Sequence, residues 1–239
     1  MDFKIEEVVP MFIKPEDLHL YESVKFIDAR DPKAYAEGHL KNAINYMKHP
    51  KVSTLEGGLE ALLLTEGGAQ LITKEPPTII PCQYDGQDNN ITDCIMATRD
   101  DVLEIINNKP SGTWLLDVRD AIEWNGLSSS PYGINFTPRK GRLPNSIWIE
   151  WYKFHELDYN KGIFKSKSNE QIQALLKEKG IQNNDKIIVY CFKGSRAAVA
   201  LMKMNQAGYT NVKNYFASWN EWSRDPQLPI DDKILDEKV

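Results

Sequence analysis

The pattern of apolar and polar positions predicts strands that alternate with helices in the second half of the chain. Lys186–Tyr190 is a short run rich in β-branched residues, typical of a buried parallel strand. From Ser195 to Gln206 apolar residues recur at helical spacing, and Gly208 ends that pattern. Val212–Ala217 is predicted to form a further strand. This alternation indicates an α/β fold in which helices flank a parallel sheet.

Two more helices are predicted from their capping signals. Thr98–Asp101 resembles a capping box, and apolar residues follow it at helical spacing. Ser168–Gln171 repeats the signal, and Gly180 marks the end of the helix that follows. Trp114–Leu116 lies between them and is predicted to be a buried strand.

The chain also contains an internal repeat. Phe26–Asp31 matches Leu115–Asp120, and Gly38–Ile44 matches Gly141–Ile147, in the same order. Such a recurrence indicates duplicated domains. In the second copy the two segments lie further apart, and the Ser, Pro and Gly of residues 125–140 predict a loop there.

The first copy is less complete than the second. Pro15 is predicted to begin its first helix, and Thr78–Cys82 to form the counterpart of the strand at 186–190. Few residues then remain before the helix that begins after Thr98. We therefore expect a shortened or degenerate, non-catalytic domain at residues 1–97 and a catalytic domain at residues 98–239.

Composition and charge exclude several classes of function. The 239 residues carry a formal net charge of -5, which gives no sign of a nucleic-acid partner. No stretch approaches the roughly 18–20 apolar residues that cross a bilayer, so no membrane partner is expected. The N-terminus lacks the features of a secretory signal, which predicts a cytoplasmic protein, or an exported one if Met1 is not the native start.

The three cysteines, Cys82, Cys94 and Cys191, are too few for a disulfide scaffold. Cys82 and Cys94 lack the close spacing of a zinc site, and histidine is scarce near them. We interpret both as ordinary thiols and expect neither a metal nor a cofactor.

Cys191 is the candidate for catalytic chemistry. It directly follows the strand at 186–190, at the edge of a parallel sheet where ligands bind. Gly194 allows the next loop to curl, and the backbone N–H groups at a helix N-terminus favour anions. Lys193 and Arg196 add positive charge, so the loop would stabilise a thiolate and hold an oxyanion beside it. The alternative is a buried structural thiol.

Three segments, Leu116–Arg119, Gly141–Ser146 and Cys191–Arg196, resemble the rhodanese superfamily when taken in that order. Ala217–Trp222 is similar to the ending of tandem thiosulfate and mercaptopyruvate sulfurtransferases. The resemblance implies a rhodanese-like fold and transfer of sulfane sulfur from thiosulfate or a related small anionic donor. The sulfur would pass through a persulfide on Cys191 to cyanide or a thiol, including a protein thiol.

The resemblance also implies roles for the loop residues. The loop N–H groups would stabilise the persulfide, while Lys193 and Arg196 would hold the sulfonate of the donor. The predicted substrate-binding residues are Phe192, Lys193, Gly194, Ser195, Arg196 and Trp219.

Three departures from the family pattern affect these expectations. Arg142 stands where the family often has His, which we expect to alter domain packing more than chemistry. The loop lacks the Gly-Ser-Gly that follows Cys in mercaptopyruvate-type enzymes, which favours thiosulfate or a persulfide donor. Cys82 has Asp85 nearby and no Arg or Lys, so we do not expect it to be catalytic.

Two other functions fit parts of the pattern. Cysteine phosphatases have five residues between Cys and Arg, whereas four separate Cys191 from Arg196, a smaller ring that suits sulfur better than a phosphoryl group. A persulfide carrier or regulatory binding module acting on a protein partner is the stronger alternative.

Two further sets of charged residues have competing interpretations. Asp117 and Arg119 are interpreted as an ion pair or loop anchor rather than an acid–base pair. The basic cluster of Arg139, Lys140 and Arg142 is interpreted as a solvated loop, with steering of an anionic donor as the alternative.

Overall fold

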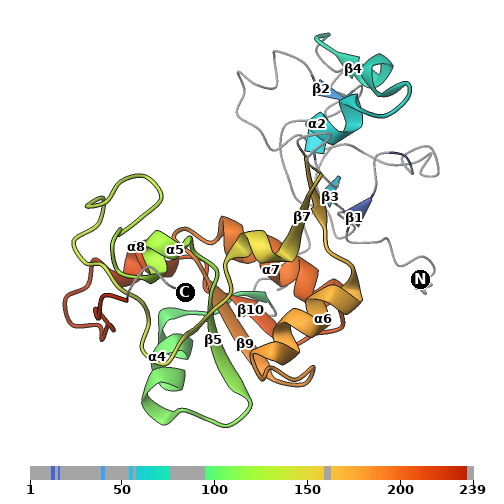
Figure 1. Cartoon of the computed structure of the whole chain (residues 1–239). Coiled ribbons are helices and arrows are strands. Elements are labelled where there is room, and N and C mark those ends of the chain that lie inside the picture. The colour runs from blue at the N-terminus through green and yellow to red at the C-terminus, as the bar shows by residue number, and fades with distance from the viewer. Residues whose placement is uncertain are drawn as a thin grey trace, which may run out of the picture. The chain divides into compact units, whose positions relative to one another are not determined.

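The computed structural model describes residues 12–13, 16, 39–40, 54–55, 58–75, 95–158 and 163–235. The chain divides into two compact units, Met1–Gln87 with Leu157–Lys165, and Asp88–Glu156 with Ser166–Val239 (Figure 1). Several predicted features lie outside the described residues: the helix at Pro15, the repeat segment Phe26–Asp31, the strand Thr78–Cys82, and Cys94.

The described part of the first unit consists of short elements. Strand β1 (Phe12–Ile13) pairs in parallel with β3 (Thr54–Leu55), and β2 (His39–Leu40) pairs antiparallel with β4 (Ile72–Thr73). Helix α2 (Gly58–Leu63) and the 3-10 helix η2 (Gly68–Leu71) lie between β3 and β4.

The second unit contains a four-stranded parallel sheet, as its sequence predicts. The strand order is β10 (Val212–Asn214), β9 (Lys186–Tyr190), β5 (Thr113–Asp117) and β6 (Ile147–Trp148). Strand β10 ends three residues earlier than predicted. Its apolar continuation does not stay in the sheet, because Phe216 is exposed and Ser218 has a positive φ of 54° that turns the chain into the next helix.

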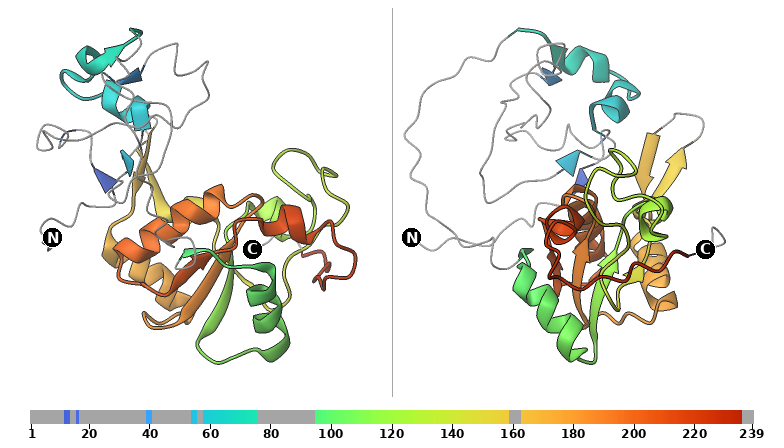
Figure 2. Two further views of the ribbon diagram at one scale, coloured as in Figure 1. Left: turned by 180° about the vertical axis from the view of Figure 1, so that it is seen from behind. Right: turned by 90° about the vertical axis from the view of Figure 1, so that its left-hand side faces the viewer.

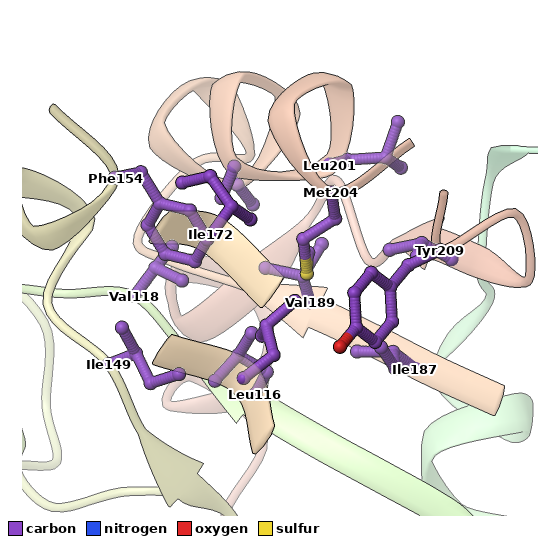
Figure 3. Close-up of a cluster of buried hydrophobic side chains, with 14 of the residues drawn as sticks. Leu116, Val118, Ile149, Phe154, Ile172, Ile187, Val189, Leu201, Met204 and Tyr209 are labelled. Carbon is purple, nitrogen blue, oxygen red and sulfur yellow. The ribbon is translucent and has the colours of Figure 1, made fainter. Parts of the chain in front are cut away.

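Helices cover both faces of this sheet because successive strand residues point to opposite sides. Ile187 and Val189 pack with α6 (Asn169–Glu178) and α7 (Ser195–Gln206) on one face (Figure 3). Ile188 and Tyr190 pack with α4 (Arg99–Asn108) and α8 (Ser218–Trp222) on the other. Both views of Figure 2 place α4 across the sheet from α6 and α7. The sheet is therefore the middle layer of three.

The helix starts confirm the capping signals. At α4 the Thr98 N–H donates to Asp101 Oδ2 at 2.8 Å, and the Asp101 N–H donates to Thr98 Oγ1 at 3.2 Å. Ser168 and Gln171 make the same reciprocal pair at α6. Each pair satisfies two backbone N–H groups that have no partner within the helix.

Residues 125–140 form a loop, as predicted, between α5 (Ala121–Trp124) and β6. Arg139 fixes the end of this loop by donating hydrogen bonds to the backbone carbonyls of Trp222, Ser223, Asp225 and Leu228. The guanidinium therefore connects the loop to the segment after α8.

Arg142 has a similar structural role. It donates to the carbonyls of Trp124 and Lys233, pairs with Asp231 at 2.8 Å, and stacks over the Trp124 ring. The interpretation of this basic cluster as a solvated surface was therefore wrong for Arg139 and Arg142, whose donors face backbone carbonyls.

The remaining described elements follow β6. They are the 3-10 helix η3 (Trp151–Phe154) and the two-stranded sheet of β7 (His155–Asp158) and β8 (Ile163–Ser166).

Candidate active site around Cys191

Cys191 lies at the carboxyl end of β9, where the chain turns toward α7. Its backbone N–H donates to Ser218 Oγ at 3.1 Å, and its carbonyl accepts from the Trp219 N–H at 3.1 Å. The carbonyl of Phe192 accepts from the Asn220 N–H at 3.0 Å. These bonds attach the start of the loop to α8, so the position of the thiol depends on two elements of the fold.

The thiol sulfur accepts a hydrogen bond from the loop itself. The Gly194 N–H donates to Cys191 Sγ at 3.1 Å, and the Asn214 amide holds the Gly194 carbonyl at 3.1 Å. Cys191 is about 1% exposed. An N–H directed at Sγ can stabilise negative charge on that atom.

Gly194 is required by the geometry of the loop. Its φ is +82°, in the left-handed region that other residues rarely adopt. A Cβ at this position would lie 2.6 Å from Phe216 Cδ2 and 2.7 Å from the Phe216 carbonyl oxygen. Backbone conformation and close approach therefore both exclude a side chain here.

Arg196 is surrounded by carboxylates. Its Nη1 lies 2.7 Å from Glu123 Oε2 and 3.0 Å from Asp120 Oδ1, and its Nη2 lies 3.2 Å from Glu123 Oε1. Burial acts to lower the pKa of Arg196, but the hydrogen bonds and charge of Glu123 outweigh burial and raise it. Burial in turn raises the pKa of Glu123, against the opposing effect of the Arg196 hydrogen bond. The Arg196 guanidinium is therefore already paired with the carboxylates of Asp120 and Glu123 at α5.

Lys193 has different surroundings. Its ammonium nitrogen lies 4.7 Å from the ring centre of Tyr132, 5.7 Å from that of Phe136 and 5.8 Å from that of Phe192. Lys193 forms no ion pair within the described part of the chain. Its charge lies against aromatic faces, and no carboxylate among the described residues neutralises it.

The other predicted binding residues differ in exposure. Ser195 is exposed at the first position of α7, whereas Phe192 is buried. The Trp219 indole is also fully buried, with the Arg119 guanidinium carbon 4.7 Å from its ring centre. Trp219 supports the loop through packing and its backbone N–H, and a direct contact with a donor stays a prediction.

The ion pair of Asp117 and Arg119 is confirmed as a structural anchor. Both side chains are fully buried, and Arg119 Nη2 lies 2.7 Å from Asp117 Oδ2. The same nitrogen donates to the carbonyl of Gly141 at 2.8 Å. The pair therefore joins the end of β5 to the segment before β6.

The structure brings in residues that the sequence reasoning missed: Asp120, Glu123, Tyr132, Phe136, Asn214 and Ser218. The spacing of Asp120 and Glu123 carried the signal of a capping box, which forms at α5. That signal locates acidic groups at a helix start but does not identify Arg196 as their partner. For the rings of the loop, the sequence held no comparable signal.

Two further features of the described residues bear on other classes of function. Among the described residues, no group of three or more His, Cys, Asp or Glu side chains is arranged to hold a metal ion. In the same residues, no helix combines the length and apolar character needed to cross a membrane.

Comparisons with known proteins agree with this geometry. The family model of the Rhodanese-like domain matches the chain twice, at residues 16–94 and 98–225. The sulfur carrier protein TtuD of Thermus thermophilus is 35% identical over 189 residues, which are 77% of this chain and 63% of that protein. A 3-mercaptopyruvate sulfurtransferase of Escherichia coli is 26% identical over 192 residues, 76% of this chain and 58% of the relative. The chain thus spans about three fifths of the length of these relatives.

Among solved structures, the anaerobic ergothioneine biosynthesis enzyme from Chlorobium limicola, in complex with trimethyl histidine, is similar with a TM-score of 0.72. The match covers 95% of this chain and 71% of that one at 17% identity. At this identity the likeness shows the fold alone.

Proposed function

Since the chain belongs to the rhodanese-like domain family and carries two such domains in tandem, we propose that it is a sulfurtransferase that carries sulfane sulfur on Cys191. The observation that carries the proposal is the loop between β9 and α7, where the Gly194 N–H donates to Cys191 Sγ. This donor faces the atom that bears the negative charge when the attacking group is a thiolate.

In the first step the Cys191 thiolate attacks the outer sulfur of thiosulfate. A bond forms between Sγ and that sulfur, the sulfur–sulfur bond of thiosulfate breaks, and sulfite leaves with the bonding electron pair. The product is an anionic persulfide on Cys191, so charge is conserved and no external oxidant is needed. The loop N–H groups would then stabilise the charge of the terminal sulfur.

In the second step an acceptor attacks the terminal sulfur. Cyanide leaves as thiocyanate, and a thiolate leaves as a persulfide, with the Cys191 thiolate regenerated in both cases. The relative named a sulfur carrier protein supports the alternative in which the physiological acceptor is a protein thiol. Such a carrier uses the same first step and differs only in the acceptor.

We propose thiosulfate, or a persulfide, as the donor rather than mercaptopyruvate. The residues after Cys191 are Phe192, Lys193, Gly194 and Ser195, which do not form the Gly-Ser-Gly of the mercaptopyruvate type. Lys193 and the loop N–H groups would bind the sulfonate. Because two Arg196 nitrogens already contact carboxylates, we assign Arg196 mainly to holding α5 and α7 together.

We also propose that the domain at residues 98–239 is the catalytic one and that the shorter domain at residues 1–97 is not. The support is the charge near each cysteine, since Asp85 follows Cys82 and Lys193 follows Cys191. The cytoplasmic location remains a prediction from the sequence.

Mass spectrometry of the protein after incubation with thiosulfate tests the proposal. We expect a gain of about 32 Da, one sulfur atom, on the peptide that contains Cys191. Cyanide or a thiol should remove it. The adduct should be absent from Cys191→Ala and present in Cys82→Ala and Cys94→Ala, which are matched controls.

Two results would contradict the proposal. One is the absence of an adduct on Cys191 with thiosulfate and with every other sulfane donor tried. The other is hydrolysis of para-nitrophenyl phosphate that depends on Cys191, which would favour the phosphatase alternative.

A further inference from the structure

Three aromatic rings surround the ammonium group of Lys193, and we call Tyr132, Phe136 and Phe192 the aromatic bracket. All three ring centres lie within 5.8 Å of the nitrogen. The rings also contact one another, with centres 5.6 Å apart for Tyr132–Phe136 and Tyr132–Phe192 and 5.8 Å apart for Phe136–Phe192. These distances are those of favourable cation–π and edge-to-face contacts.

The bracket has two sources. Phe192 is buried in the Cys191 loop itself, whereas Tyr132 and Phe136 are exposed on the loop of residues 125–140. Their loop is internally hydrogen bonded. The Ser129 N–H donates to the Ile134 carbonyl at 2.9 Å, and the Ser129 hydroxyl accepts from the Thr137 N–H at 3.0 Å. Tyr132 and Phe136 are therefore presented to Lys193 by a folded segment.

The two cations of the Cys191 loop differ in how their charge is compensated. Arg196 faces the carboxylates of Glu123 and Asp120 at 2.7 and 3.0 Å. Lys193 faces only ring faces among the charged and aromatic groups of the described chain. Of these two cations, only Lys193 therefore lacks a compensating carboxylate among the described residues, and an anion that approaches the loop meets this charge.

A free lysine side chain has many rotamers, and binding an anion would restrict them. Ring contacts restrict them before the anion arrives, because the ammonium already has a preferred position. We propose that Tyr132 and Phe136 are positioning residues that hold Lys193 for the anionic group of the sulfur donor. This inference rests on the proposed function and extends it, because it makes the loop of residues 125–140 a determinant of donor affinity.

Steady-state kinetics with thiosulfate test the role of each ring. Tyr132→Leu and Phe136→Leu should each raise KM by about 2- to 5-fold, the size of one exposed cation–π contact, with kcat changed far less. The conservative substitution Tyr132→Phe keeps the ring face, so its KM should stay close to that of the wild-type protein. Ile134→Ala is the matched control, because Ile134 is exposed on the same loop and its side chain is not part of the bracket.

A double-mutant cycle tests whether the rings act through Lys193. In a Lys193→Met background, Tyr132→Leu and Phe136→Leu should leave KM at the value of Lys193→Met alone, because no ammonium remains for the rings to hold. A KM that is unchanged or lowered by the ring substitutions in the wild-type background would overturn the inference. So would a ring effect that persists in full without Lys193.

The adduct on Cys191 separates this inference from the proposed function. If every variant forms the persulfide at saturating thiosulfate while KM does not respond to the rings, only the positioning role fails. If the wild-type protein forms no adduct, the proposed function fails and this inference fails with it.

Discussion

The two sides of the Cys191 loop carry the same formal charge in opposite settings. On the Lys193 side the residue is exposed and its ammonium group lies against aromatic rings. On the Arg196 side the guanidinium side chain is about 13% exposed and is paired with Glu123, whose side chain is fully buried. The comparison teaches that a cation near a reactive thiol can serve the fold or the ligand, and that its partners decide which.

The two settings predict different costs in stability when each cation is removed. Removing one member of a buried pair leaves the other charge without compensation, which costs far more than the pair itself contributes. Removing an exposed charge leaves nothing stranded, because water replaces the lost contact. The Arg196 side should therefore be sensitive in stability, and the Lys193 side sensitive in donor binding.

Arg196→Met gives the largest expected effect. We expect the free energy of unfolding to fall by about 3–5 kcal/mol, because Glu123 would remain buried without its partner. Urea denaturation followed by tryptophan fluorescence measures the loss. Lys193→Met, the matched control, should change stability by less than about 0.5 kcal/mol. In the double variant Arg196→Met with Glu123→Gln, part of the lost stability should be recovered. Equal losses of stability in Arg196→Met and Lys193→Met would contradict the comparison.

Gly194→Ala tests the residue between the two sides. We expect a cost of about 2–4 kcal/mol, because backbone strain is added to the contact with Phe216. Gly208→Ala is the control: its φ is also positive, at +95°, but its nearest neighbour is Asn183 Nδ2 at 4.0 Å. That change should cost only about 1 kcal/mol of backbone strain in the same urea titration. Similar costs at both sites would argue against the close approach of Phe216.

Alkylation of Cys191 with an anionic and a neutral reagent measures the charge on the Lys193 side without any sulfur chemistry. Lys193→Met should lower the ratio of the iodoacetate rate to the iodoacetamide rate by about 3-fold, the effect of one nearby charge in a high-dielectric setting. Lys193→Arg should keep the ratio. Peptide mass spectrometry must follow Cys191 alone, since the chain also contains Cys82 and Cys94. The same ratio in wild type and Lys193→Met would show that Lys193 does not act on anions at this thiol.

Salt gives the smallest expected effect. Because an exposed charge is screened, KM for thiosulfate should rise about 2-fold between about 20 mM and about 200 mM NaCl in the wild-type protein. In Lys193→Met the same change of salt should have little effect. A steep salt dependence that survives this substitution would place the relevant charge elsewhere.

Much of the second unit could be predicted from its sequence because the signals are local. The strand at Lys186–Tyr190 and the helix at Ser195–Gln206 have the predicted bounds, since each depends on the periodicity of its own residues. The capping boxes at Thr98 and Ser168 are confirmed for the same reason. The prediction of Cys191 at a strand-to-helix turn follows directly from these two elements.

The partners of the two cations could not be predicted, because they lie far away in the sequence. Glu123 is 73 positions from Arg196, and only the packing of α5 beside the start of α7 brings them together. The rings that hold Lys193 come from a loop whose composition predicts only that it is a loop. Local patterns located both charges, and tertiary contacts assigned different roles to them.

The contacts of Arg139 and Arg142 bear on how the second unit can be produced alone. α8 is the last helix in the described part of the chain and ends at Trp222. A recombinant fragment that stopped there would keep every residue of the Cys191 loop but would lose the carbonyls of Ser223, Asp225 and Leu228 that Arg139 contacts.

The same fragment would also lose Asp231 and the Lys233 carbonyl, both partners of Arg142. Guanidinium donors that are partly or fully buried would then lack acceptors, at the end of the loop that carries Tyr132 and Phe136. A fragment designed to retain this loop should therefore extend at least to Lys233.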